Sequence, residues 1–335
     1  MKAPGFWTAR RPTFLARALQ PVGWAYGRLA AVRMAGRGAR APVPVICVGN
    51  FVAGGAGKTP AAMALARMLL ADRRRVAFLS RGYGGEKRDL PILVDPGRHD
   101  ARAVGDEPLL LAGVAPTFVG ADRVRSAHMA VHAGAEVLIL DDGLQNPALV
   151  KDLAFGVVDG ETGFGNGLCL PAGPLRAPLA EQAPHVAGLI VVGGGHKAVD
   201  DARRAFPGKP VLHAGLEPDA LAAAPLIGRE VVAFCGIARP EKFYATLRRI
   251  GAQIVATRDF ADHHPFTQRE FERLANEASR RGALLVTTEK DRVRLSAAQA
   301  EAVLTLPVTL RFDDPDALRR MLRRVFGEPS RERSS

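Results

Sequence analysis

The sequence contains few cysteines and no long apolar run. Its 335 residues include 3 cysteines, Cys47, Cys169 and Cys235, which are isolated from one another. This spacing excludes the close pairs of a zinc site and the dense pattern of a disulfide scaffold. No stretch supplies the roughly 18 to 20 consecutive apolar residues that span a bilayer, and the first residues lack the apolar core of a secretory signal. We therefore expect a protein that stays in the cytoplasm and has no membrane span.

Acidic residues are missing from the beginning of the chain, because no Asp or Glu precedes Asp72. Within residues 1–40, arginines alternate with bulky apolar and aromatic side chains such as Phe14 and Trp24. This composition predicts one basic amphipathic helix, or two helices separated at Pro21, lying on an anionic lipid surface. The alternative is an arginine-rich helix that packs on the protein's own core.

The whole chain carries a formal charge of +12, which calls for an anionic partner. The sequence has no RNA-binding strand signature, zinc finger or heptad-bearing basic region, so charge alone would support a nucleic-acid partner. We therefore expect no nucleic-acid partner, and no motif indicates an obligate protein partner. The expected partner of residues 1–40 is an anionic membrane surface.

Two packed lobes are expected, because 335 residues exceed the usual size of one hydrophobic core. From residue 43 onward, β-rich runs alternate with amphipathic stretches, which predicts an α/β fold with a parallel sheet flanked by helices. A Pro-rich stretch at 207–225 has little periodicity and is predicted to connect this sheet to a second, smaller α/β lobe. The predicted division is a basic amphipathic helical segment at 1–40, a P-loop core at 41–218, a second lobe at 219–327 and a disordered tail at 328–335.

The expected elements follow from the same alternation. In the first lobe, strands are predicted at 43–48, 76–80, 116–119, 137–140, 154–158 and 189–192, with helices at 60–70 and 122–133. In the second, strands are predicted at 230–235, 253–257 and 283–287, with helices at 240–250, 267–281 and 315–326.

The strongest local signal is a glycine-rich loop between a strand and a helix. The loop ends in Gly54, Gly55, Ala56, Gly57, Lys58 and Thr59. Glycines let backbone N–H groups turn toward phosphate oxygens, a lysine neutralises the terminal phosphates, and a threonine hydroxyl can bind Mg²⁺. These residues are therefore predicted to bind ATP with Mg²⁺ in a P-loop NTPase-like fold. The match is incomplete, because Val52 stands where G-x-x-x-x-G-K-[ST] has its first glycine. A loop that only packs a helix on a strand is the structural alternative.

Two carboxylates follow the predicted strand 137–140. Asp141 and Asp142 stand at the carboxyl end of this strand, where α/β proteins place ligand chemistry, and they are candidate Mg²⁺ ligands. Either could instead cap a helix. Gln145 follows closely and could orient a phosphate or a water molecule.

Transfer of a phosphoryl group to an alcohol also benefits from a base beside the hydroxyl, because the hydroxyl proton must leave. Asp106 is one candidate, and His263 could lie across the cleft from the second lobe. Each has a structural alternative, since an Asp before Glu-Pro often caps a helix and a loop histidine is commonly a surface group.

Taken in order, these and further motifs resemble those of the tetraacyldisaccharide 4'-kinases, enzymes of lipid A synthesis. No single motif is decisive, but the ordered set is specific and covers most of the chain. The motifs are VGN (48–50), GGAGKTP (54–60), SRGYG (80–84), GDEP (105–108), DDGLQ (141–145), LPAGPLR (170–176), FCGIARPEKF (234–243), DHH (262–264) and TEKD (288–291).

The resemblance implies a two-lobed enzyme that transfers the γ-phosphate of ATP to the 4'-hydroxyl of a tetraacylated glucosamine disaccharide, a lipid A precursor, and so forms lipid IVA. It gives Asp106 the role of base, assisted by His263. The other residues that it implies are Lys58 and Thr59 for ATP and Mg²⁺, then Asp141, Asp142 and Gln145 around the metal and phosphates, and finally Arg81, Tyr83 and Arg176 as phosphate or substrate contacts.

A substrate with four acyl chains cannot leave the bilayer freely, so the enzyme must come to it. The expected location is therefore the cytoplasmic face of the bacterial inner membrane, with peripheral attachment through residues 1–40.

One position departs from the family pattern. Ala177 follows Arg176 where the family has an acidic residue, which leaves any metal or nucleotide contact of that acid without a counterpart. The loop 53–59 also resembles that of dimeric partitioning ATPases, but Ala53 stands where those carry a signature lysine. A nucleic-acid-stimulated ATPase is a second alternative, and stimulation of ATP hydrolysis by RNA or DNA would distinguish it.

Overall fold

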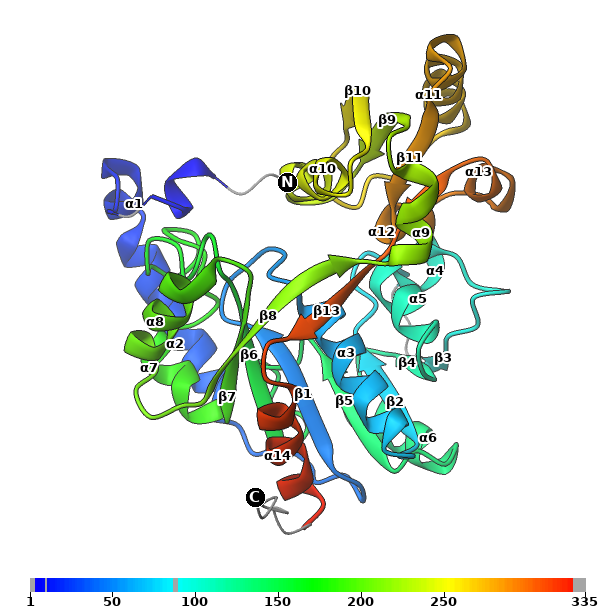
Figure 1. Cartoon of the computed structure of the whole chain (residues 1–335). Coiled ribbons are helices and arrows are strands. Elements are labelled where there is room, and N and C mark those ends of the chain that lie inside the picture. Colours follow the sequence, from blue (N-terminus) through cyan, green and yellow to red (C-terminus); the bar gives the residue numbers. More distant parts are fainter. Residues whose placement is uncertain (1–3, 10, 87–89, 328–335) are drawn as a thin grey trace, which may run out of the picture.

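A nine-stranded sheet forms the first lobe. The computed structural model describes residues 4–9, 11–86 and 90–327, so the predicted tail at 328–335 lies outside the described residues. The strand order is β13-β8-β7-β6-β1-β5-β2-β4-β3 (Figure 1), and all neighbouring strands are parallel except the β13–β8 and β3–β4 pairs at the two edges. The bounds are β1 Val45–Asn50, β2 Val76–Ser80, β3 Ile92–Leu93, β4 Thr117–Val119, β5 Val137–Asp141, β6 Leu153–Asp159, β7 Gly188–Val192, β8 Val211–Pro218 and β13 Val308–Phe312.

Helices cover both faces of this sheet, so the central strands are buried along their whole length and read as continuous apolar runs. On one face, α3 (Lys58–Ala71), α5 (Asp106–Ala112) and α14 (Pro315–Val325) share a core with the strands. On the other face, the cover comes from α6 (Arg123–His132), α7 (Leu179–Gln182) and α8 (Gly195–Ala205). The predicted P-loop-type sheet flanked by helices is confirmed, and β1 at its centre places the glycine-rich loop at the carboxyl edge.

The second lobe is a four-stranded parallel sheet with the order β10-β9-β11-β12. Its strands are β9 (Glu230–Cys235), β10 (Gln253–Asp259), β11 (Leu284–Thr288) and β12 (Leu304–Leu306). Helix α10 (Pro240–Arg249) packs on one face and α11 (Gln268–Arg281) on the other. The short helices α9 (Ala220–Ala223), α12 (Glu289–Arg292) and α13 (Ala297–Glu301) complete the lobe.

The chain returns to the first sheet after the second lobe, which differs from the predicted division at 219–327. Strand β13 pairs antiparallel with β8, and α14 then packs on the first-lobe core. The stretch 207–225, predicted to be an irregular connection, contains β8, whose far end crosses toward the second lobe (Figure 1). Local periodicity missed both features, because the β8–β13 pairing joins segments about a hundred residues apart and only the folded sheet brings them together.

Two helices form the N-terminal segment, α1 (Phe14–Ala18) and α2 (Gln20–Met34). The break predicted at Pro21 falls at Leu19, and Pro21 stands in the first turn of α2. Helix α2 packs closely through Gly23 and Gly27, where an added Cβ would lie 2.7 Å from the carbonyl oxygen of Cys169 and 3.0 Å from its sulfur, respectively. Within the described residues, no helix combines the length and the apolar character needed to cross a membrane.

Candidate active site

The glycine-rich loop connects β1 to α3. Gly57 has a φ of 90°, a left-handed conformation that glycine adopts without a steric penalty, and Lys58 begins the helix directly after it. Asn50 holds the other side of the loop, because its amide Nδ2 donates to the carbonyl oxygen of Gly54 at 2.8 Å. Pro60 stands in the first turn of α3, where a missing N–H is tolerated. The backbone therefore has the turn and the helix N-terminus that bind phosphate groups.

Buried Lys58 and partly exposed Asp142 form an ion pair at the end of the loop. The Lys58 Nζ lies 3.1 Å from Oδ2 of Asp142, and Arg176 donates to the other oxygen, Oδ1, at 2.6 Å. Burial acts to raise the pKa of Asp142, but the charges and hydrogen bonds of Lys58 and Arg176 outweigh it and hold the pKa below its usual range. Asp142 is therefore an anion with both oxygens engaged by cationic side chains, and it positions Lys58 and Arg176.

Asp141 differs from its neighbour, because one of its oxygens has no partner. Its side chain is buried, with 2% of the residue exposed, and Oδ1 makes no hydrogen bond to the described part of the chain. Burial first, and the charges of Glu107 and Asp142 next, raise the pKa of Asp141 to about 8 against the opposing charges of Lys58 and Lys290. A buried carboxyl group with a raised pKa and an oxygen that has no hydrogen-bond partner in the described residues has the properties expected of a metal ligand before the metal binds.

Gln145, which follows β5, is hydrogen-bonded to the end of β1. Its Nε2 donates to the carbonyl oxygen of Asn50 at 2.7 Å and to Oε1 of Gln182 at 2.8 Å. Gln182 in turn donates to the carbonyl oxygen of Ala177 at 2.6 Å, and Ala177 is fully buried. Ala177, the position that departs from the family pattern, therefore belongs to the hydrogen-bonded group of Gln145 and Gln182. Because the Gln145 amide nitrogen already donates to these two protein acceptors, it is not directed at a phosphate or a water molecule in this structure.

Asp106 and His263 come together across the lobe boundary. Asp106 is the first residue of α5 in the first lobe, and its Oδ2 lies 2.9 Å from Nδ1 of His263 in the loop after β10. His263 has a φ of 61°, which residues with a side chain adopt rarely, and its backbone N–H donates to the carbonyl oxygen of Gly236 at 3.2 Å. A rare backbone conformation held at a lobe junction is typical of functional sites. The structure thus brings together the two residues that sequence reasoning considered separately as bases.

Cations of the second lobe also contact this segment. Arg294 donates to Oδ2 of Asp106 from Nε at 3.0 Å and from Nη2 at 2.5 Å, and Lys290 lies 3.5 Å from Glu107. Burial acts to raise the pKa of Asp106, but the hydrogen bond with His263 and the charges of Lys290 and Arg294 bring it well below its usual range. Sequence reasoning missed Arg294, although it stands only three residues beyond the TEKD motif.

Arg81, Tyr83 and Arg123 lie near these groups on the first lobe. Tyr83 is 72% exposed, and its ring centroid is 5.8 Å from that of His263 in an edge-on arrangement. Arg123 is buried, and burial followed by the charge of Arg81 lowers its pKa to about 10. Arg81 and Arg123 therefore form a cationic pair beside Asp141 and Asp142. Arg123 was missed because a basic first residue of a helix carries no sequence signal for ligand binding.

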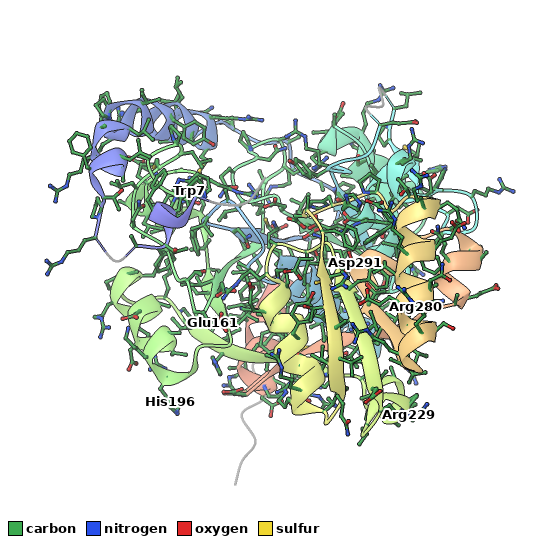
Figure 2. The ribbon with its side chains drawn as sticks, turned by 90° about the horizontal axis from the view of Figure 1, so that it is seen from above. Trp7, Glu161, His196, Arg229, Arg280 and Asp291 are labelled. Carbon is green, nitrogen blue, oxygen red and sulfur yellow. The ribbon has the colours of Figure 1, made fainter. Side chains whose placement is uncertain are left out.

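The two halves of the site face each other. The charges of Glu107 and Lys290 act on Asp141, which places α5 and α12 close to the strand ends that carry the loop. Helix α12 lies beside α5 and α4 (Ala101–Val104) in Figure 1, and Figure 2 labels Asp291, a residue of α12. A second contact joins the lobes at β6, where Lys242 of α10 lies 2.6 Å from Asp159 and Arg239 pairs with Asp159 and Glu161. The arrangement can bind a nucleotide phosphate on one side and remove a proton on the other.

Comparison with known proteins finds relatives along almost the whole chain. The family model of the tetraacyldisaccharide-1-P 4'-kinases matches residues 15–327. A tetraacyldisaccharide 4'-kinase of Methylorubrum extorquens is 55% identical over 328 residues, covering 97% of this chain and 99% of its own length. The enzyme of the same name from Methylobacterium radiotolerans is 54% identical over 330 residues, covering 98% of this chain and all of its own.

A solved structure also matches most of the fold. The crystal structure of LpxK from Aquifex aeolicus in complex with ATP superimposes with a TM-score of 0.74 at 28% sequence identity. The match covers 93% of this chain and 100% of that chain. The similarity therefore includes both lobes and extends beyond the glycine-rich loop.

Proposed function

The chain belongs to the tetraacyldisaccharide-1-P 4'-kinase family, and we propose that it transfers the γ-phosphate of ATP to the 4'-hydroxyl of a tetraacylated glucosamine disaccharide 1-phosphate, forming lipid IVA. The observation that carries this proposal is that the site contains two groups of residues, one suited to bind phosphate and one suited to accept a proton. Lys58 and the glycine-rich loop belong to the first lobe, whereas the Asp106–His263 pair forms only where the second lobe packs on it. A nucleotide switch has no need of the second group.

The residues at the carboxyl edge of β1 and β5 fit a nucleotide with Mg²⁺. In the proposed complex, backbone N–H groups of residues 54–59 hold the phosphates, and Lys58 neutralises the terminal phosphate. The Thr59 hydroxyl and the unpartnered Oδ1 of Asp141 are the proposed Mg²⁺ ligands. Bound Mg²⁺ supplies positive charge that offsets the charge developing on the phosphate oxygens. Asp142 was considered as a ligand with Asp141, but its contacts with Lys58 and Arg176 favour a positioning role instead.

The acceptor hydroxyl must lose its proton as the new bond to phosphorus forms. The proposed proton acceptor is the Asp106–His263 pair, which lies where the two lobes meet. Arg81, Tyr83 and Arg176 border the same region and are proposed to contact phosphate groups or sugar hydroxyls, for which guanidinium groups are suited. Arg123 is buried beneath these residues, and its guanidinium donates to the carbonyl oxygen of Gly120, so it adds positive charge to the region without being proposed as a direct contact.

The N-terminal segment is proposed to attach the enzyme peripherally to the cytoplasmic face of the inner membrane. Large apolar side chains of α1 and α2 lie exposed to solvent, with Phe14 89%, Trp24 69% and Leu29 73% exposed. Arginines of the same helices can contact anionic headgroups. Helix α2 packs on the protein through Gly23 and Gly27. The apolar side chains that it leaves exposed support the proposed contact with lipid.

Charge on this apolar surface should weaken membrane binding. For the variant Leu29→Glu, we expect roughly tenfold weaker partitioning onto vesicles containing phosphatidylglycerol, because burial of one leucine side chain stabilises by roughly 1.5–3 kcal/mol. Vesicle sedimentation measures this effect. The matched control is Leu221→Glu, which changes another highly exposed leucine, on α9 of the second lobe. Equal sedimentation of the two variants would contradict a lipid-binding role for α2.

The proposed activity is tested by incubation with γ-labelled ATP and the tetraacylated disaccharide 1-phosphate, followed by separation of the lipids. We expect the label in a lipid product that carries one more phosphate. Hydrolysis of ATP to free phosphate without labelled lipid, or stimulation by RNA or DNA, would contradict the proposal.

A further inference from the structure

The beginning of the chain is hydrogen-bonded to the loop 160–178, which connects β6 to α7 and contains the LPAGPLR motif. A single 3-10 turn, η1 (Gly5–Trp7), precedes the two N-terminal helices, and Figure 2 labels Trp7 on it. The backbone N–H of Asn166 donates to the carbonyl oxygen of Trp7 at 2.8 Å, and the Asn166 amide Nδ2 donates to that of Phe6 at 3.2 Å. In the other direction, the Trp7 indole Nε1 donates to the carbonyl oxygen of Pro171 at 3.1 Å. The turn and the loop are therefore joined by hydrogen bonds that run both ways.

The loop is shaped to receive this turn. Gly165 has a φ of 63°, and an added Cβ there would lie 2.5 Å from the carbonyl oxygen of Trp7. An added Cβ at Gly173 would collide with Oδ1 of Asn166. The Asn166 amide is fully used, because Nδ2 also donates to the carbonyl oxygen of Ala172 at 3.0 Å and Oδ1 accepts the N–H of Leu168 at 3.1 Å. Asn166 thus fixes the loop and the turn at the same time.

The N-terminal helices have few other fastenings. The buried residues of α2 are Gly23, Gly27 and Met34, and α1 buries Ala16. Glycine and alanine remove little apolar area from water, so this packing holds the helices weakly. Only residues 8–13 separate η1 from α1, so the hydrogen bonds of η1 restrict where both helices can lie on the first lobe.

The other end of the loop 160–178 contacts the phosphate site. The carbonyl oxygen of Pro174 accepts the N–H of Ala53, in the glycine-rich loop, at 2.8 Å. The N–H of Arg176 donates to the carbonyl oxygen of Phe51 at 2.9 Å, and its guanidinium donates to Asp142 at 2.6 Å. One loop therefore connects the N-terminal segment to the residues proposed to hold phosphate.

We propose that Asn166 and Trp7 are positioning residues, which fasten the membrane-binding helices to the loop 160–178 and so fix the height of the phosphate site above the lipid surface. The proposal rests on the proposed phosphoryl transfer and membrane attachment, and deepens them. Four acyl chains keep the acceptor hydroxyl near the lipid–water interface, so the enzyme must hold the γ-phosphate within reach of that plane. A misplacement of about 1 Å is enough to cost roughly 10²-fold in rate.

The test compares wild type with Asn166→Asp and Trp7→Phe. Asn166→Asp replaces the Nδ2 donor by an oxygen that faces the carbonyl oxygens of Phe6 and Ala172, whereas Trp7→Phe removes one donor and keeps an aromatic ring. With the acceptor embedded in vesicles containing phosphatidylglycerol, we expect kcat/KM to fall about tenfold or more for Asn166→Asp and less for Trp7→Phe. Calorimetric affinity for ATP with Mg²⁺ and sedimentation with vesicles should stay near wild type. Transfer to the disaccharide 1-phosphate without acyl chains, dissolved in water, should also stay near wild type.

The matched control is Asn276→Asp, which makes the same chemical change at an exposed position of α11 in the second lobe. Wild-type transfer of label to the embedded acceptor is required first, since its absence refutes the proposed function and not the role of Asn166. If Asn166→Asp loses equal rate on the embedded and the dissolved acceptor, or loses ATP affinity, its role is to support the phosphate site locally and the proposal is overturned. A wild-type rate on the embedded acceptor overturns it as well.

Trp7 fluorescence tests the contact itself. The chain has 2 tryptophans, Trp7 and Trp24, so Trp7 is the single reporter in a Trp24→Phe background. Asn166→Asp in this background should increase quenching of Trp7 by acrylamide, because the turn is released from the loop, and Asn276→Asp should not. Equal quenching in the two would show that Asn166 does not hold the turn, and would overturn the proposal.

Discussion

Replacement of Lys58 by alanine is expected to lower kcat by about 10³-fold or more, because phosphoryl transfer depends almost entirely on positioning and charge stabilisation. Lys58 lies at the first residue of α3, where its ammonium is held by Asp142. The variant removes the cation proposed to neutralise the terminal phosphate and frees one oxygen of Asp142. Steady-state transfer of label to lipid measures the effect.

The control for this variant is Lys197→Ala, which removes an exposed lysine of α8 that pairs only with Asp201 in the described structure. We expect this change to leave kcat near wild type, because exposed ion pairs contribute little. The melting temperature of both variants shows whether they remain folded. A folded Lys58→Ala enzyme with wild-type kcat would be incompatible with phosphate binding by this loop.

Replacement of Asp106 by asparagine is expected to lower kcat by about 10²-fold to 10⁴-fold, the range that acid–base catalysis supplies, with a much smaller change in ATP affinity. Asparagine keeps the size of the side chain but lacks the negative charge that lies beside Nδ1 of His263. It also places an amide against Arg294, whose donors then lose an ionised acceptor. Single-turnover transfer separates this loss of rate from nucleotide binding.

Asp100→Asn provides the matched control for the same chemical change. Asp100 caps α4 in the segment that leads to Asp106, and its Oδ1 accepts the N–H of Ala103. Asparagine caps a helix about as well as aspartate, so we expect little change in rate or stability. Comparable rates for Asp106→Asn and Asp100→Asn would remove Asp106 from the proton-transfer machinery.

The parts of the fold that sequence predicted are those with local signals. The strands of the first sheet are buried on both faces and read as short apolar runs, and α6 begins at the Asp122 cap as the sequence indicated. The pairing of β13 with β8 has no such signal, because it depends on contacts between residues about a hundred positions apart. Residues 308–325 therefore could not be assigned to the first lobe from periodicity alone.

The site divides in the same way. Lys58, Thr59 and Asp141 could be identified because strand, loop and helix follow one another in the chain. Arg294 could not be identified from sequence, because its contacts with Asp106 arise only when the second lobe packs on α5. The different surroundings of Asp141 and Asp142 could not be predicted either, since adjacent aspartates look alike in sequence. Only the structure shows that one faces two cations and the other has a free oxygen.

The central claim is that residues 54–59 hold the phosphates of ATP for transfer to an alcohol. Its most direct test is calorimetric titration of the protein with ATP in the presence of Mg²⁺, carried out on wild type and on Lys58→Ala. We expect saturable binding of one nucleotide to the wild type and strongly weakened binding to the variant. Absence of binding to a folded wild-type protein, or equal affinity in the two, would contradict the account.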